Sequence, residues 1–156
     1  MSQIRSRVGL TLLLTIAVLH YGGETPAEPA LQKGEVVIDG RIKIGVEVAR
    51  SPQAQAKGLG GRLSLKKGTG MLFPYDAPAH RAFWMKGMLI PLDILWIVGG
   101  KIVAIEMNIP PPSPKTAPAI YSHQADLVLE VRAGYVEEMG IRVGQSVGVS
   151  YDSVSR

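Results

Sequence analysis

Glycine and proline interrupt this chain so often that its secondary-structure elements must be short. Its 156 residues include 18 glycines and 11 prolines. Turn pairs such as Asp39-Gly40 and Gly99-Gly100 separate apolar stretches whose length and composition suit β-strands. Around Asp39-Gly40 the aliphatic residues fall at even positions, namely Val36, Ile38, Ile42, Ile44, Val46 and Val48. This alternation predicts a β-hairpin with one buried face.

The rest of the chain continues in short pieces. Ser51-Pro52 predicts the start of a helix that ends at Gly58. We expect further strands at 71–73 (ended by Pro74), 82–85, 92–98, 101–107 and 127–131, with an extended proline-rich loop at 110–118. A one-turn helix at 135–139 should precede a closing hairpin at 141–149. Together these elements predict a mainly-β fold, a single compact β-sandwich or barrel-like domain with one or two short helices.

The N-terminus has the pattern of a secretory signal. Arg5 and Arg7 precede residues 8–21, an apolar stretch that would span only about 21 Å as a helix, short of the roughly 30 Å hydrocarbon core. We therefore expect a signal peptide at 1–27, with an uncleaved anchor as the alternative. A flexible linker at 28–34, a domain at 35–150 and a tail at 151–156 would follow. The expected location is periplasmic or extracellular, with membrane contact only through an uncleaved N-terminus.

Composition narrows the classes of function. Cysteine is absent, so packing rather than disulfides must hold an exported fold together. Loss of residues 1–27 would leave 15 basic and 12 acidic side chains, spread along the chain rather than clustered. We therefore expect no nucleic-acid partner. His80 and His123 have no ligand-spaced neighbours, so we expect no metal and no cofactor.

Several segments resemble the prokaryotic family named domain of unknown function 192. They are Gly58-Leu59 with Arg62, GMLF at 70–73, FWMK at 83–86, IPLDIL at 90–95, and LEV-AG at 129–134 followed by Gly140-Ile141. The resemblance covers about residues 46–149. It implies a small mainly-β fold, frequently exported, with no established activity. Members commonly carry Asn-Thr where this chain has Gly87-Met88, so a polar contact made by that Asn would be missing here.

The stretch from Arg81 to Val98 contains the most suggestive side chains. Trp84 and Lys86 share one face if they lie on a strand. Trp84 could then be a stacking platform for a sugar or another flat ligand, with Lys86 contacting an anionic group. The alternative is structural, with Trp84 covering one end of the core and the Lys86 stem lying along it.

Two carboxylates lie among apolar neighbours. Asp93 is expected to pair with a cation, from Arg81, Lys86 or Arg62, because an unpaired buried charge is costly. Glu130 has an exposed partner, Arg132, within reach on its own strand face. Either carboxylate in a cleft could instead act as a general base, and a pair about 5 to 9 Å apart could cleave a glycosidic bond.

These observations favour an exported, non-enzymatic binding module over an enzyme. Its partner would be an unknown small ligand or a protein of the cell envelope. We assign no catalytic residue. The alternative is an envelope hydrolase that uses Asp93 or Glu130. The candidate ligand-binding residues are Trp84, Lys86, Arg81, Asp93, Arg62 and Glu130, and the proline-rich loop would form the rim of their cleft.

Overall fold

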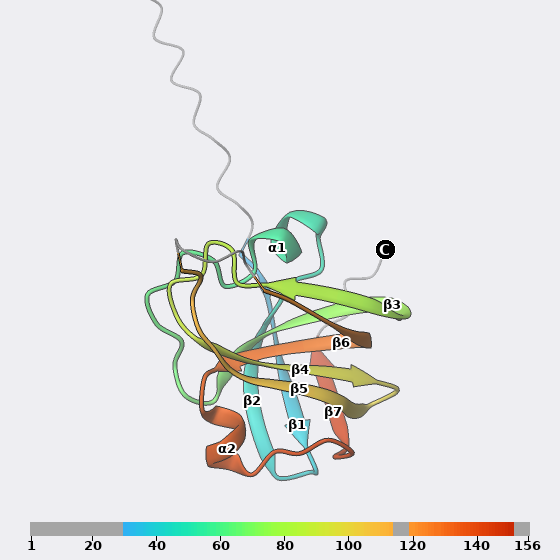
Figure 1. The fold of residues 1–156 in the computed structure, drawn as a ribbon. Coiled ribbons are helices and arrows are strands. Elements are labelled where there is room, and N and C mark those ends of the chain that lie inside the picture. The colour runs from blue at the N-terminus through green and yellow to red at the C-terminus, as the bar shows by residue number, and fades with distance from the viewer. Residues whose placement is uncertain (1–29, 114–118, 152–156) are drawn as a thin grey trace, which may run out of the picture.

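A single curled sheet of seven strands makes up most of the computed structural model, which describes residues 30–113 and 119–151 (Figure 1). The strand order is β5-β4-β6-β3-β2-β1-β7. The strands are β1 (Gln32–Ile38), β2 (Ile42–Val48), β3 (Thr69–Trp84), β4 (Leu92–Val98), β5 (Lys101–Ile109), β6 (Ile120–Arg132) and β7 (Val147–Tyr151). The helices are α1 (Pro52–Lys57) and α2 (Tyr135–Met139). The predicted mainly-β fold with short helices is confirmed.

The sheet curls until its two edges touch at one end. Strands β4, β5 and β6 cross in front of β1, β2 and β7 in Figure 1. At the edge of β5, Lys101 forms a β-bridge with Ser146, just before β7. The Val147 N–H also donates to the Gly100 carbonyl at 2.8 Å. The described residues therefore form a half-barrel that is closed at this end only.

Each face of the sheet carries its own apolar core. The concave face holds the aliphatic residues of β1 and β2, and its members include Val36, Ile44, Leu95 and Leu129. The opposite face of β3, β4 and β6 carries a second core that includes Trp96, which is fully buried. That second face is covered by α1 and by the segment after β3. A pocket between α1 and the C-terminal end of β3 forms the site described below.

The predicted β1–β2 hairpin is confirmed. Ile38 lies opposite Ile42, so three residues, 39–41, form the turn; Asp39 and Gly40 both have positive φ, and the Arg41 N–H donates to the Ile38 carbonyl at 3.0 Å. The capped helix after Ser51 and the β4–β5 turn at Gly99-Gly100 also form as predicted.

Several boundaries differ from the prediction. Strand β3 continues through Pro74 to Trp84, because its register with β6 shifts between Pro74 and Ala79 and this irregularity accommodates the proline. Residues 141–149 form no hairpin; β7 pairs instead with β1. β1 begins at Gln32, so residues 32–34 of the expected linker are strand. Tyr151, expected in the tail, belongs to β7.

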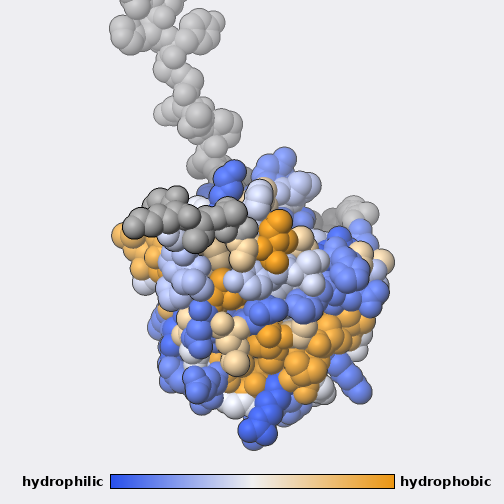
Figure 2. Space-filling view, viewed as in Figure 1, coloured by the Kyte–Doolittle hydropathy of each residue, from blue (hydrophilic) through white to orange (hydrophobic). Residues whose placement is uncertain are grey.

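Apolar surface remains on the edge of the sheet. Figure 2 shows a patch of hydrophobic side chains on the lower right, over the part of the sheet formed by β4 and β5. Val103 and Met107 of the edge strand β5 are 42% and 54% exposed.

Within 30–113 and 119–151, no helix has the length and hydrophobicity needed to cross a bilayer. The predicted signal segment lies outside the described residues, as do residues 28–29 of the expected linker, 114–118 of the proline-rich loop and 152–156 of the tail.

Candidate functional site

A pocket of about 330 Å³ lies between α1 and the C-terminal end of β3, and we call it the Glu130 pocket. It combines aromatic rings, two lysines and one carboxyl group. Its lining residues are Gln55, Ala56, Lys57, Gly58 and Leu59 of α1 and the turn after it, Phe73, Tyr75, Ala82, Phe83 and Trp84 of β3, Lys86 and Met88 of the next turn, and Glu130 of β6.

Two local interactions hold α1 over this face of the sheet. The Ser51 hydroxyl accepts a hydrogen bond from the Ala54 N–H at 3.1 Å, which caps the helix. The Gln55 side-chain amide donates to the carbonyl oxygens of Ala49 (3.2 Å) and Pro74 (3.3 Å). The second of these bonds ties the helix to β3 where β3 bends, so it fixes one wall of the pocket against another.

A tight turn after β3 places Lys86 beside Trp84. The Met88 N–H donates to the Met85 carbonyl at 3.0 Å, and Gly87 has φ of +76°, the value of the third position in a type II turn. Asn also tolerates that position, so the Asn that the family resemblance implies here would fit the same backbone. The Lys86 ammonium then lies 5.3 Å from the centre of the Trp84 ring, which is 54% exposed.

Glu130 is the only acidic side chain among the described lining residues. It lies on β6 between Met71 of β3 and Ile94 of β4, and it is 6% exposed. Its Oε2 has no hydrogen-bond partner. Burial raises the pKa of Glu130 to about 8, so the carboxyl is mostly neutral at pH 7. At neutral pH its chemistry in this pocket is therefore that of a hydrogen-bond donor held among apolar groups.

Aromatic rings form the wall beside this carboxyl. Phe73 and Phe83 meet edge to face with 5.0 Å between ring centres, and Phe83 meets Trp96 of the core in the same way at 6.1 Å. These contacts tie the pocket wall to the buried core. The wall is thus fixed before any ligand arrives.

Arg81 does not line the Glu130 pocket. Its guanidinium stacks over the Tyr75 ring at 3.9 Å and donates to the Ala77 carbonyl at 2.9 Å. Arg81 therefore contacts the pocket only through Tyr75, whose ring lines the pocket and stacks against the Arg81 guanidinium.

Asp93 has partners of a different kind from those predicted. It is fully buried; its Oδ1 accepts from the Asn108 N–H at 2.7 Å, and its Oδ2 accepts from the Val136 N–H at 3.0 Å. The prediction that Asp93 would pair with Arg81, Lys86 or Arg62 is wrong. Backbone amides, one of them in the first turn of α2, take the place of a cation.

Asp93 and Glu130 also cannot act together. In the ladder between β4 and β6, Asp93 lies opposite Val131 and Glu130 lies opposite Ile94. Neighbouring positions on a strand point to opposite faces. The hydrogen bond to Val136 places Asp93 on the side of the concave core, whereas Glu130 faces the pocket. The sheet therefore separates the two carboxyl groups of the expected acid/base pair.

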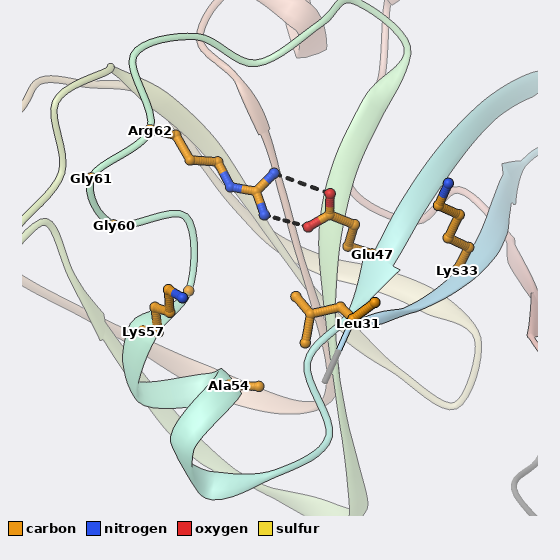
Figure 3. A pocket seen from close by; sticks show the side chains of 10 residues that line it. Leu31, Lys33, Glu47, Ala54, Lys57, Gly60, Gly61 and Arg62 are labelled. Atoms are coloured by element: carbon orange, nitrogen blue, oxygen red, sulfur yellow. Dashed lines mark hydrogen bonds and ion pairs between the residues drawn. The ribbon is translucent and has the colours of Figure 1, made fainter. Parts of the chain in front are cut away.

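Arg62 lies in a different hollow, of about 460 Å³, on another side of α1 (Figure 3). Its guanidinium forms a two-pronged ion pair with Glu47, in which Nη1 lies 3.1 Å from Oε1. Hydrogen bonding from Arg62 lowers the pKa of Glu47 below its usual value. Because the Arg62 guanidinium and the Glu47 carboxylate neutralise each other, neither offers an unpaired charge to a ligand in this hollow.

Glu130 does not pair with Arg132. That arginine instead binds Glu138 of α2, with its Nη2 at 2.6 and 2.5 Å from the two carboxylate oxygens. Of the six predicted site residues, the structure thus brings together Trp84, Lys86 and Glu130. It places Arg81, Asp93 and Arg62 elsewhere.

Sequence reasoning missed the contributions of Tyr75 and Lys57. Tyr75 was hidden because Pro74 was interpreted as the end of a strand. Lys57 lies at the end of a helix whose own prediction was correct, but nothing in the sequence indicates that this helix covers Glu130.

Comparisons with known proteins agree on a family without a described activity. The family model for domain of unknown function 192, described as "Uncharacterized ACR", matches residues 35–149. A crystal structure from Sinorhizobium meliloti 1021, described as a candidate transcription regulator, is 31% identical, with 78% of this chain and 97% of that chain covered and a TM-score of 0.71.

A protein of unknown function from Novosphingobium aromaticivorans DSM 12444 is also similar. It is 31% identical, with 76% of this chain and 86% of that chain covered and a TM-score of 0.66. The search of curated proteins found no significant match.

Proposed function

The chain belongs to the family named domain of unknown function 192, and on that premise we propose that it binds a small ligand in the Glu130 pocket without transforming it. The observation that carries this proposal is the unpartnered Oε2 of Glu130, buried at the wall of a pocket large enough for a small organic molecule. A buried polar atom without a partner costs about 1 to 3 kcal/mol. A ligand that supplies the missing partner would recover that cost.

The walls support binding by shape and stacking. Trp84 remains half exposed although it is a large apolar side chain, and Lys86 lies over its ring. A flat ligand could therefore cover the exposed part of Trp84, beside the other aromatic side chains that line the pocket. This arrangement is typical of a pocket with a few convergent polar groups in an apolar lining.

The alternative, an envelope hydrolase, has less support. Both oxygens of Asp93 accept backbone hydrogen bonds on the far side of the sheet, so Asp93 could not reach a substrate in this pocket. Glu130 would have to act without a second carboxylate, since the described lining residues include no other acid. The described lining therefore lacks the carboxylate pair that most glycoside hydrolases use, and this favours binding over glycosidic hydrolysis.

The description of the S. meliloti relative raises regulation of transcription as a second candidate function. In this chain, two arginines that could contact phosphates are engaged elsewhere: Arg62 with Glu47, and Arg132 with Glu138. We therefore propose no nucleic-acid partner. Absence of binding to random duplex DNA at 0.15 M salt would agree with this, whereas sequence-selective binding would contradict it.

The binding proposal is tested by screening aromatic fragments against ¹³C-methyl-methionine-labelled protein. Met88 lines the pocket, whereas Met107 lies outside it on β5. A bound fragment should therefore change the NMR chemical shift of the Met88 methyl group and leave that of the Met107 methyl group unchanged. Trp84→Ala should abolish the shift while its melting temperature stays close to that of the parent, because Trp84 is half exposed. Leu63→Ala, at a position 84% exposed and outside the pocket, is the matched control. Fragments that bind Trp84→Ala as well as the parent would refute the proposal.

We also propose export, on the strength of the apolar stretch at 8–21 behind Arg5 and Arg7. Cell fractionation followed by mass spectrometry should find a chain that lacks about the first 27 residues in the envelope or medium. Recovery of the full-length chain in the cytosolic fraction would contradict export. Recovery of the full-length chain in the membrane fraction would indicate the uncleaved anchor instead.

A further inference from the structure

We propose that the Glu130 pocket selects an uncharged carbonyl compound with an aromatic or apolar body, whose oxygen accepts a hydrogen bond from the Glu130 carboxyl. This inference rests on the proposed binding function and adds the chemical class of the ligand. The geometry that carries it is the buried, unpartnered Oε2 of Glu130. A Cβ built on Gly58 would lie 3.9 Å from this oxygen and 3.6 Å from the Phe73 ring.

The protonation state of Glu130 decides what it can recognise. Burial is the cause of its raised pKa of about 8. The carboxyl therefore holds its proton at neutral pH and can donate it in a hydrogen bond. The complementary group is an acceptor without a charge of its own, such as a ketone, ester or amide oxygen.

The other charged groups around the pocket disfavour a cationic ligand. The titratable side chains that line the pocket together with Glu130 are Lys57 from α1, Tyr75 from β3 and Lys86 from the turn after β3. Its neighbours in the sheet, Met71 and Ile94, carry no charge. With Glu130 neutral, the described lining has two positive charges and no negative one. A cation would find no ionised acidic side chain among the described lining residues, and a negative group on the ligand would lie nearer to Lys86.

An anion is also unsuited to the inner part of the pocket. A carboxylate placed against the buried Glu130 carboxyl would lose its hydration among Phe73, Tyr75 and Phe83. An uncharged oxygen avoids this penalty. It also supplies the partner that Oε2 lacks.

Three compounds with the same phenyl body test this choice. Acetophenone has a neutral carbonyl, benzoate is an anion, and 1-phenylethylamine is a cation at neutral pH. We expect acetophenone to shift the Met88 methyl at pH 6.5 with a dissociation constant in roughly the millimolar range, as suits a ligand of this size. The other two compounds should bind at least about 10-fold more weakly, and the Met107 methyl reports whether the fold is intact.

The pH dependence provides a second, independent readout. If only the protonated carboxyl binds acetophenone, a pKa near 8 leaves roughly 3% of the sites competent at pH 9.5, so the affinity should fall about 30-fold from pH 6.5. Glu130→Gln keeps a donor that does not titrate, so its affinity should be the same at both pH values. Glu137→Gln, an exposed position on α2, should keep the 30-fold change.

The outcomes separate this inference from the proposed function. If benzoate or 1-phenylethylamine shifts Met88 as strongly as acetophenone, or if acetophenone binds equally at pH 6.5 and 9.5, the inference is overturned and the pocket remains a binding site. If none of the three compounds shifts Met88 in the parent or in Glu130→Gln, both the inference and the proposed function fail.

Discussion

Glu130 should make the folded protein less stable as the pH rises, and the size of this effect follows from its burial. In the unfolded chain the carboxyl ionises near the ordinary glutamate pKa of 4.5, whereas in the folded chain burial raises the pKa to about 8. Between these two values the folded state holds a proton that the unfolded state has lost. The free energy of unfolding therefore falls as the pH rises through this window, and it stops falling above about pH 8.

The expected magnitude is large for a single side chain. Each pH unit inside the window costs about 1.4 kcal/mol, so between pH 5 and pH 7 the protein should lose about 3 kcal/mol. The whole window amounts to about 5 kcal/mol. Against a typical total stability of roughly 5 to 15 kcal/mol, this loss is easily measured. Glu130→Gln has no titrating group at this position and should lack this slope.

Urea unfolding at pH 5, 6, 7 and 8.5 measures the effect. The informative quantity is the difference in unfolding free energy between Glu130→Gln and the parent, because contributions from other titrating groups cancel in it. This difference should change in favour of the variant by about 3 kcal/mol from pH 5 to pH 7. The exposed control Glu137→Gln should follow the parent. If the curves of Glu130→Gln and the parent stay parallel across this range, Glu130 is not desolvated as described, and the neutral-donor argument fails with it.

Three further variants test other parts of the structure. Asp93→Asn should destabilise the fold by about 2 to 4 kcal/mol in urea unfolding, because one amide oxygen cannot serve both backbone donors; a loss below about 1 kcal/mol would contradict this role. Gly87→Asn should leave the melting temperature nearly unchanged, whereas Gly87→Val should lower it, because a β-branched residue is strained at φ of +76°; equal effects would argue against the turn. Arg62→Met should raise the pKa of Glu47 toward its usual value in a carboxyl NMR titration, with a stability loss of no more than about 1 kcal/mol, and an unchanged pKa would exclude the ion pair.

Much of the fold was predictable because its signals are local. Alternation around Asp39-Gly40 specifies both the hairpin and its buried face, since a shift of one residue would expose every aliphatic side chain. Ser51 and Gly58 bound α1 by capping, which depends on neighbouring backbone groups alone. The pairing of β7 with β1 was missed because it joins segments more than 100 residues apart, and nothing in residues 141–149 encodes the partner.

The candidate site was only partly predictable for the same reason. Trp84 and Lys86 are close in sequence, and a local turn brings them together. That Glu130 joins them depends on the antiparallel pairing of β6 with β3, which the sequence does not reveal. Asp93 shows a different limit. The cost of burying its charge was recognised, but a cation was expected where the backbone amides of Asn108 and Val136 supply the compensation.

The pairing of β7 with β1 also governs when this chain can complete its fold. β1 is the earliest of the seven strands to leave the ribosome, and one of its two neighbours in the sheet is the latest. Until Val147–Tyr151 has been synthesised, β1 presents a row of unpaired backbone groups that other chains could capture. Contacts that span so much sequence also form slowly. Nascent chains halted before residue 147 should therefore aggregate rather than fold, even though they already contain every residue of the Glu130 pocket.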